Sequence, residues 1–405
     1  MRIAVIGSKG LPPKQGGIEH HCAEIYSRMA SRGHSVDLFG RSSYTNLPPY
    51  HSYDFKGVQI ISLPCLNVRG VDALTSSALA AITTVRSRYD VIHFHASGPA
   101  LFSCLPQIAS NFRWLTKSTV SPKIVVTCHG LDWRRAKWGN FSSRLIQLGE
   151  LTAAQFADEL IVVSQELQSY FLKTYGRRAV YIGNAPANYA ASDASFAYGN
   201  SLGLRPKHYI LFLGRLVPEK RPDLLVQAFQ KLNPPGWKLV LVGGNSDTAT
   251  FTSNLRELAE ASPNILFTGE LRGKRLAEIV RGAGLFVLPS SIEGLPLAML
   301  EAMNEGIPVL ASDIPVHRQL LSNERGKLFQ EGNIEACVSS LSWAINHQHK
   351  LADMAKKAQL YVQTQHNWDT ITSECLSLYG DFSTVSTAIK EEENLGSSGS
   401  RVKIV

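Results

Sequence analysis

The stretch from Phe286 to Val309, FVLPSSIEGLPLAMLEAMNEGIPV, constrains this chain more than any other. The apolar run over 285–288 predicts a buried strand. Pro296 and Gly306 have the positions expected at the start and just past the end of a helix. Glu293 therefore falls in a strand-to-helix turn, and Glu301 lies inside the helix, roughly two turns below its start. The sequence thus places one carboxylate on each side of a helix N-terminus.

Free backbone N–H groups at this helix start, around Gly294 and Leu295, are suited to bind an anion. A phosphorylated ligand bound there would meet Glu293, and its polyol part could reach Glu301. In outline, this is a nucleotide-sugar site. Each carboxylate also has an ordinary explanation, since Glu293 could serve the helix dipole and Glu301 could be a solvated helix position.

The pair Glu293 and Glu301 resembles the E-x7-E motif of retaining glycosyltransferases of the GT-B fold, the large family-4 or group 1 class. The resemblance extends to the neighbouring residues, which are Pro289-Ser290, Glu293-Gly294, Leu300 to Met303 and Gly306 to Val309. It implies two Rossmann-like, doubly wound parallel-sheet domains that face a cleft, with a C-terminal helix crossing back to the N-terminal domain. The implied reaction transfers a sugar from a nucleoside-diphosphate sugar to an acceptor hydroxyl, with retention of configuration.

A second segment, GRLVPEKRP, follows a predicted strand over 209–213 and resembles the family's G-R-L-x-x-x-K segment. The planar fork of Arg215 and the point charge of Lys220 together suit two linked phosphates. A solvated basic loop is the alternative. The resemblance assigns Arg215, Lys220 and Glu293 to the catalytic group, Glu301 to the ribose hydroxyls, and Arg272 to a place beside the base.

The N-terminus reads as a strand over 3–6, a glycine-rich loop, a helix over 18–32 and a strand over 35–39, which is the start of a doubly wound domain. Gly16 and Gly17 would let backbone N–H groups approach a diphosphate closely, although a flexible connection explains them equally well. The loop resembles the family's N-terminal glycine loop. The opening is also similar to a rhamnosyltransferase-like branch of bacterial polysaccharide assembly, which suggests a glycan or lipid-linked glycan acceptor.

Histidines mark two further predicted strands. The strand over 123–128 ends at His129, where parallel sheets bind ligands. By resemblance, His129 matches the histidine that contacts the donor sugar near the reaction centre, and we assign it to the catalytic group. For His93 and His95, on a strand over 91–94, we expect structural roles, with only one of them facing the ligand side.

We expect an N-terminal domain over 1–190, complemented by a crossing helix over 366–382, and a C-terminal domain over 206–365, joined by a linker over 191–205. Residues 383–405 are rich in Ser, Glu and Gly, and we expect disorder there. The apolar run at the N-terminus is too short for a signal peptide or a spanning helix. Six scattered cysteines indicate free thiols in a reducing compartment, so we expect a cytoplasmic protein.

The net charge of +8 arises in the N-terminal half. Up to Tyr189 the chain has 20 Lys and Arg against 11 Asp and Glu, whereas the remainder has 21 against 22. A basic half suggests an anionic membrane surface or nucleic acid. Segment 101–145 interleaves apolar and basic residues, notably Trp133 to Trp138, so it could lie peripherally on the inner face of the plasma membrane; a core-packed helix is the alternative. No nucleic-acid-binding motif accompanies the charge, and we expect no such partner.

The chain has no D-x-D motif. Because cations are built into the chain, we expect neither a metal ion nor a cofactor, and we favour a UDP-sugar over GDP- or dTDP-sugars as donor. The competing hypotheses are a nucleotide-sugar epimerase of the same fold, and a non-catalytic protein that binds glycan or nucleic acid.

Overall fold

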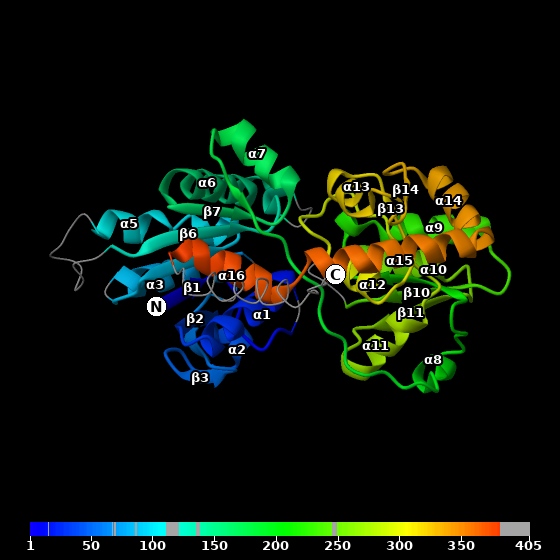
Figure 1. Cartoon of the computed structure of the whole chain (residues 1–405), viewed down its shortest axis with the longest axis horizontal. Coiled ribbons are helices and arrows are strands. Elements are labelled where there is room, and N and C mark those ends of the chain that lie inside the picture. The colour runs from blue at the N-terminus through cyan, green and yellow to red at the C-terminus, as the bar shows by residue number, and fades with distance from the viewer. Residues whose placement is uncertain are drawn as a thin grey trace, which may run out of the picture.

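The computed structural model describes residues 1–14, 16–66, 68, 70–85, 87–110, 121–134, 138–244 and 249–380. In this part of the chain two lobes lie side by side, each built on one sheet with helices packed around it (Figure 1). The tail over 383–405, for which we expect disorder, lies outside the described residues.

The sheet of the first lobe has eight strands in the order β3-β4-β2-β1-β5-β6-β7-β8, and every pair is parallel except β3 with β4. The strands are β1 (Arg2–Ile6), β2 (Ser35–Arg41), β3 (Ser52–Phe55), β4 (Val58–Leu63), β5 (Val91–His95), β6 (Lys123–Cys128), β7 (Glu159–Val162) and β8 (Val180–Tyr181). The order reverses between β1 and β5.

The sheet of the second lobe has six parallel strands in the order β11-β10-β9-β12-β13-β14. They are β9 (Tyr209–Leu213), β10 (Lys238–Val242), β11 (Ile265–Gly269), β12 (Leu285–Leu288), β13 (Val309–Ser312) and β14 (Lys327–Phe329). The order reverses between β9 and β12, which is the Rossmann arrangement. The prediction of two Rossmann-like parallel-sheet domains is confirmed.

Helices connect the strands in both lobes. In the first lobe they are α1 (Gly17–Ser31), α2 (Ser42–Thr45), α3 (Val71–Val85), α4 (Ser97–Ala100), α5 (Cys104–Ser110), η1 (Asp132–Arg134), α6 (Asn140–Phe156) and α7 (Gln165–Tyr175). The second lobe contains α8 (Ala197–Ser201), η2 (Pro218–Lys220), α9 (Pro222–Leu232), α10 (Ala249–Ala259), α11 (Gly273–Gly282), α12 (Leu297–Asn304), α13 (Pro315–Leu321), α14 (Ile334–Asn346) and α15 (Gln348–Gln365), and the chain continues into α16 (Trp368–Tyr379). Helix α8 lies within the expected linker, 191–205, and packs against α11. The domain boundaries stay a prediction.

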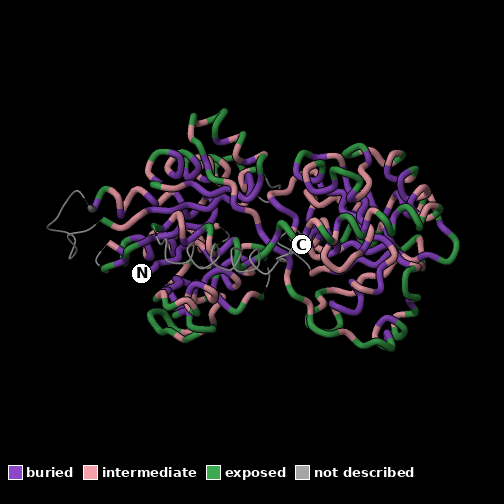
Figure 2. Tube along the Cα trace, in the orientation of Figure 1, coloured by how far each residue is buried: buried purple, intermediate pink, exposed green. Residues whose placement is uncertain are grey.

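Both faces of the first sheet are buried, as expected for parallel strands covered by helices. In β1, Ile3 and Val5 belong to one apolar cluster, whereas Ala4 and Ile6 belong to another. Side chains of a strand alternate between the two faces of the sheet, so each face of β1 contributes to its own core. Figure 2 shows the same result as buried segments running through the centre of each lobe.

The last two helices join the lobes. Helix α15 packs on α12 of the second lobe, and α16 packs on α1 of the first (Figure 1). The contact face of α16 is buried and includes Trp368, Leu376 and Tyr379. The Tyr379 hydroxyl lies 2.5 Å from His93 Nδ1. The expected crossing helix is therefore present.

Leu376→Ala should lower the free energy of unfolding by about 2–5 kcal/mol, because Leu376 is fully buried where α16 crosses to the first lobe. Urea unfolding followed by circular dichroism measures the loss. Leu360→Ala, on the exposed face of α15, is the control and should change stability by less than about 0.5 kcal/mol. Equal effects of the two changes would contradict a docked α16.

Candidate functional site

The predicted site residues follow the carboxyl ends of strands near the two points where strand order reverses. Gly17 begins α1 after the loop that leaves β1, and His129 follows β6. Arg215 follows β9 by two residues, and Glu293 lies in the turn after β12. Open parallel sheets bind ligands at these strand ends. The topology therefore collects residues from distant parts of the sequence at one edge of each sheet.

The two edges meet directly. A Cβ atom placed on Gly294 would lie 1.9 Å from the His129 carbonyl oxygen, so the turn after β12 rests against the loop after β6. A Cβ atom on Gly17 would lie 3.3 Å from Leu297 Cδ1, which places the start of α1 against the first residue of α12. The glycine loop predicted from the sequence thus faces the helix start predicted to bind an anion.

Lys220 and Glu293 form the central ion pair of the second lobe. Lys220 Nζ donates to Glu293 Oε1 over 2.6 Å, and Ser290 Oγ donates to the same oxygen over 2.8 Å. Burial alone would raise the pKa of Glu293, but Lys220 and Ser290 outweigh it, so the pKa lies below its usual value and the carboxyl is ionised at neutral pH. A cation predicted to bind phosphate and a carboxylate assigned with it to the catalytic group are thus in direct contact.

Close backbone packing positions this cation. A Cβ on Gly214 would lie 3.1 Å from Lys220 Cδ, so the glycine leaves room for the lysine stem. A Cβ on Gly243, after β10, would lie 1.9 Å from the Gly214 carbonyl oxygen and 3.8 Å from Arg215 Cα. The loop carrying Arg215 and Lys220 is therefore fixed against the neighbouring strand end. The roles assigned to these two residues stay predictions.

Glu301 is connected to the segment between the lobes. The Tyr189 hydroxyl donates to Glu301 Oε2 over 2.7 Å. Burial raises the pKa of Glu301 to about 7, although hydrogen bonds from Tyr189 and the Ala187 backbone favour the charged form. The carboxyl is then only partly ionised at neutral pH. Two oxygens offer further acceptor positions, so ribose binding by Glu301 stays a prediction.

Arg272 reaches across to the first lobe. Its Nη2 donates to the Lys14 carbonyl over 2.7 Å and lies 3.2 Å from Glu270 Oε2. Its predicted place beside the donor base is untested. In this structure the side chain connects the start of α11 with the glycine-rich loop.

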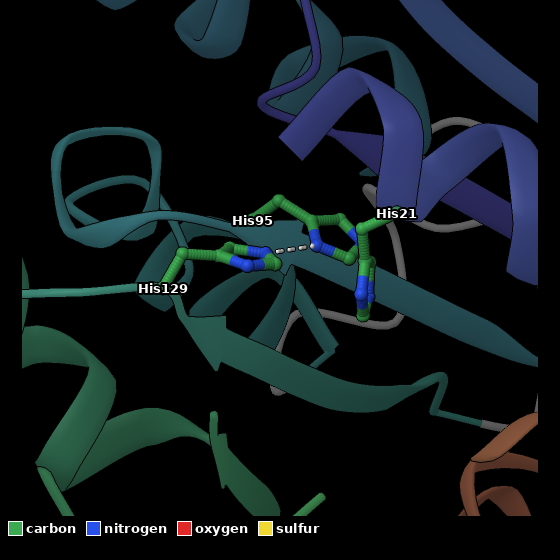
Figure 3. Close-up of side chains that lie close together, drawn as sticks. All are labelled: His21, His95 and His129. Atoms are coloured by element: carbon green, nitrogen blue, oxygen red, sulfur yellow. Dashed lines mark hydrogen bonds between the residues drawn. The ribbon is translucent and has the colours of Figure 1, made fainter. Parts of the chain in front are cut away.

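A buried hydrogen-bond network extends from His129 into the first lobe. Figure 3 shows His129 Nε2 facing His95 Nδ1, at 3.0 Å. His95 Nε2 lies 2.6 Å from the Tyr26 hydroxyl, which lies 2.8 Å from His93 Nδ1. Burial lowers the pKa of His93 and His95, so both are neutral at physiological pH. A neutral imidazole has one donor and one acceptor nitrogen, so this network fixes the ring orientation of His129.

His21 approaches the same point from α1. Its Nδ1 lies 2.6 Å from Asn184 Oδ1, and its ring meets the His129 ring edge-on at 4.8 Å between centroids (Figure 3). One nitrogen each from His21, His95 and His129 lie within 4.8 Å of one another. A metal ion there would have to replace the hydrogen bond between His95 and His129.

The expectation that only one of His93 and His95 faces the ligand side was wrong. Their rings stack with centroids 4.3 Å apart, because residues two apart on a strand point to the same face. The sequence analysis also missed Tyr26, His21 and Asn184. A signal was available for Tyr26 and His21, since α1 starts at Gly17, directly after Gly16, and so begins at the cleft. No local signal marks Asn184.

The basic aromatic segment is described only in part. Arg135 and Lys137, like 111–120 with Arg113, Trp114 and Lys117, lie outside the described residues. The Arg134 guanidinium carbon lies 5.0 Å from the centroid of the Trp133 ring. Across the described ranges, no helix is both long enough and apolar enough to cross a membrane.

Two family profiles match the chain. Residues 200–361 match Glycosyl transferases group 1, and residues 15–185 match Glycosyltransferase Family 4. The chain belongs to this glycosyltransferase group. It therefore transfers a sugar from a nucleotide sugar, and the two matches follow the two lobes.

Relatives and solved structures agree with this assignment. The D-inositol 3-phosphate glycosyltransferase of Gordonia bronchialis is 25% identical and covers 93% of this chain and 88% of its own. Sucrose-phosphate synthase from Thermosynechococcus elongatus has a TM-score of 0.75 at 20% identity, covering 93% of this chain and 98% of its own. HepE of Anabaena, solved with UDP and glucose, has a TM-score of 0.75 at 19% identity, covering 94% and 99%. The structural likenesses show the shared GT-B fold.

Gly294→Ala should reduce kcat/KM of the glycosyltransferase by about 100-fold, because a Cβ atom would push the turn after β12 away from His129 and misplace the reacting groups. Steady-state kinetics measure the loss, and small-angle scattering measures the separation of the lobes. Gly98→Ala is the matched control, since a Cβ there meets no atom within 4 Å. Unchanged turnover in Gly294→Ala would show that this approach is not required.

Glu301→Gln should alter the pH dependence of stability. The folded pKa of about 7 lies above the unfolded value, so between pH 4.5 and 7 the folded state keeps a proton that the unfolded state has lost. Stability of the wild type should therefore fall as pH rises through this window, by roughly 1–3 kcal/mol relative to the variant. Urea unfolding across this range measures the difference. The exposed change Glu331→Gln should leave the wild-type profile intact; the same profile for Glu301→Gln would contradict the raised pKa.

Proposed function

We propose that the protein is a retaining glycosyltransferase that uses a UDP-sugar and needs no resident metal ion. The observation that carries this proposal is the contact between Lys220 and Glu293, which places a cation and an ionised carboxylate at the reversal of strand order in the second sheet. Gly294, next to Glu293, lies against His129 of the first lobe. Donor, acceptor and reacting groups would meet at this point.

The chemical difficulty of the reaction is the charge that develops on the leaving diphosphate. Positive groups fixed before the reaction stabilise this charge without reorganising during it. Lys220 and Arg215 would supply two such groups, and backbone N–H groups around Gly294 and Leu295, in the turn that precedes α12, would add a third contribution. Gly16 and Gly17, on the opposite side, would let the backbone of the first lobe approach the same phosphates.

Glu293 and His129 would hold the donor sugar. Because the pKa of Glu293 is lowered, its carboxylate can accept hydrogen bonds from sugar hydroxyls at neutral pH. The buried network behind His129 orients its ring at the cleft. Retention would follow if the acceptor attacks the face from which the diphosphate leaves, with a donor phosphate oxygen taking the acceptor proton. Glu301 would bind the ribose hydroxyls.

The finer assignments rest on similarity and composition. HepE has been solved with UDP and glucose and with UDP-glucose, which favours a UDP-sugar here. The similarity of the N-terminal segment to rhamnosyltransferase-like enzymes favours a glycan or lipid-linked glycan acceptor in the assembly of bacterial polysaccharide. The basic first lobe suits a cytoplasmic enzyme at the inner face of the plasma membrane.

A ligand screen tests the donor. UDP-, GDP- and dTDP-sugars are added to the full-length protein, and thermal unfolding is recorded. A ligand at 100 times its Kd stabilises the folded state by about 2.7 kcal/mol. The configuration of the product, read by NMR, then decides between retention and inversion. Stabilisation by none of the nucleotide sugars would contradict the proposal. Consumption of the donor without any acceptor would favour an epimerase.

Lys220→Ala should lower kcat by about 100- to 1,000-fold through the loss of charge opposite the leaving group. Lys220→Arg keeps the charge beside Glu293 and should retain more turnover than the alanine variant. Lys231→Ala is the matched control, because Lys231 forms a comparable ion pair with Glu335 on the surface. Rapid-mixing single-turnover assays separate chemistry from binding. A kcat for Lys220→Ala within twofold of the wild-type value would refute its catalytic role.

A further inference from the structure

A cavity of about 640 Å³ lies beside the proposed reaction centre. It is lined by η1, by α6 and by one residue of the second lobe, Ile292, which precedes Glu293 in the chain. The residues that line it are Trp133, Arg134, Asn140, Ser143, Arg144, Gln147 and Ile292. The cavity thus lies between the lobes, and its first-lobe wall begins four residues after His129. Its volume is typical of pockets for small ligands.

The α6 side of the cavity is a single helix face. Asn140, Ser143, Arg144 and Gln147 occur at positions i, i+3, i+4 and i+7, which lie on one side of a helix. All four side chains can donate hydrogen bonds. Gly139, the N-cap of α6, makes no side-chain hydrogen bond to the first N–H groups of the helix. This helix face therefore presents several hydrogen-bond donors to the cavity.

The charged residues that line the cavity are all positive. Arg134 and Arg144 both line it, and no carboxylate does. Burial raises the pKa of Glu166 on α7. The positive charge of Arg134 lowers this pKa by a smaller amount, so the pKa is raised overall. Within the described part of the chain, neither guanidinium lies within ion-pair distance of a carboxylate. The Trp133 ring, which packs against Arg134, adds a flat apolar surface of the kind on which a sugar ring stacks.

We infer that this cavity binds the acceptor, and that the acceptor has a phosphate group held by Arg134 and Arg144 near its accepting hydroxyl. The inference rests on the proposed function and adds the chemical class of the acceptor. A guanidinium group can donate two parallel hydrogen bonds to the oxygens of a phosphate. A neutral sugar carries no charge with which two such cations could pair. The phosphate belongs either to a soluble sugar phosphate or to a polyprenyl-phosphate lipid. Phe141, 76% exposed on the first turn of α6, would suit the lipid.

Binding to the full-length protein tests the site without knowledge of the natural acceptor. Saturating UDP first occupies the donor site, so that phosphate binding there is excluded. Glucose 6-phosphate and glucose are then titrated and followed by calorimetry. Glucose 6-phosphate should bind and glucose should not. The double variant Arg134→Gln with Arg144→Gln should weaken this binding by about tenfold or more. Arg178→Gln is the matched control, since it removes an exposed charge from the same lobe and should leave the affinity unchanged.

Vesicles of phosphatidylcholine, with or without polyprenyl phosphate, separate the two sources. Co-sedimentation that needs the lipid phosphate and is lost in the double variant identifies the lipid, whereas binding of glucose 6-phosphate alone identifies a soluble acceptor. If neither probe binds, or both bind equally well to the double variant, the inference is overturned. A different result would refute the proposed function, namely that no nucleotide sugar stabilises the protein. Transfer to a neutral acceptor at the same rate in the wild type and the double variant would refute only the acceptor class.

Discussion

The ion pair between Lys220 and Glu293 is the interaction on which the rest of the site depends. A mostly buried carboxylate without a partner would be costly or would be protonated, and here a lysine and the Ser290 hydroxyl meet it. These partners come from the loops after β9 and β12, which adjoin only because the strand order of the sheet reverses between them. The fold therefore makes it possible for one small volume to hold both a positive and a negative charge.

The first lobe supplies contacts to this pair mostly through backbone and through a buried network. Gly294 lets the turn after β12 meet the backbone at His129, and Gly17 lets the start of α1 approach the Leu297 side chain. Behind His129, neutral histidines and Tyr26 connect the cleft to Tyr379 on α16. Since α16 follows the second lobe in the chain, the helix that crosses between the lobes also supports the histidine at the cleft. The same buried residues therefore join the lobes and orient His129.

The cavity lined by η1, α6 and Ile292 differs in charge from the Lys220–Glu293 pair. Lys220 and Glu293 are in direct contact, whereas Arg134 and Arg144 line their cavity with no carboxylate among its walls. Arg134 and Arg144 are two of the 20 Lys and Arg residues of the N-terminal half, whose excess of positive charge the sequence shows without placing it in space.

Much of the fold and of the donor side could be predicted from sequence. Apolar runs such as 285–288 and the Pro and Gly signals around α12 determine strands, helices and turns locally, and the spacing of Glu293 and Glu301 places both on one strand–turn–helix unit. Other features depended on tertiary structure: the Tyr189 hydrogen bond that accompanies the raised pKa of Glu301, the reach of Arg272 to Lys14, and the contacts of Tyr26 with His93 and His95. Local patterns are set by backbone geometry over a few residues. Contacts between residues far apart in the sequence exist only after the sheets have formed and the lobes have met, and therefore no local pattern in the sequence records them.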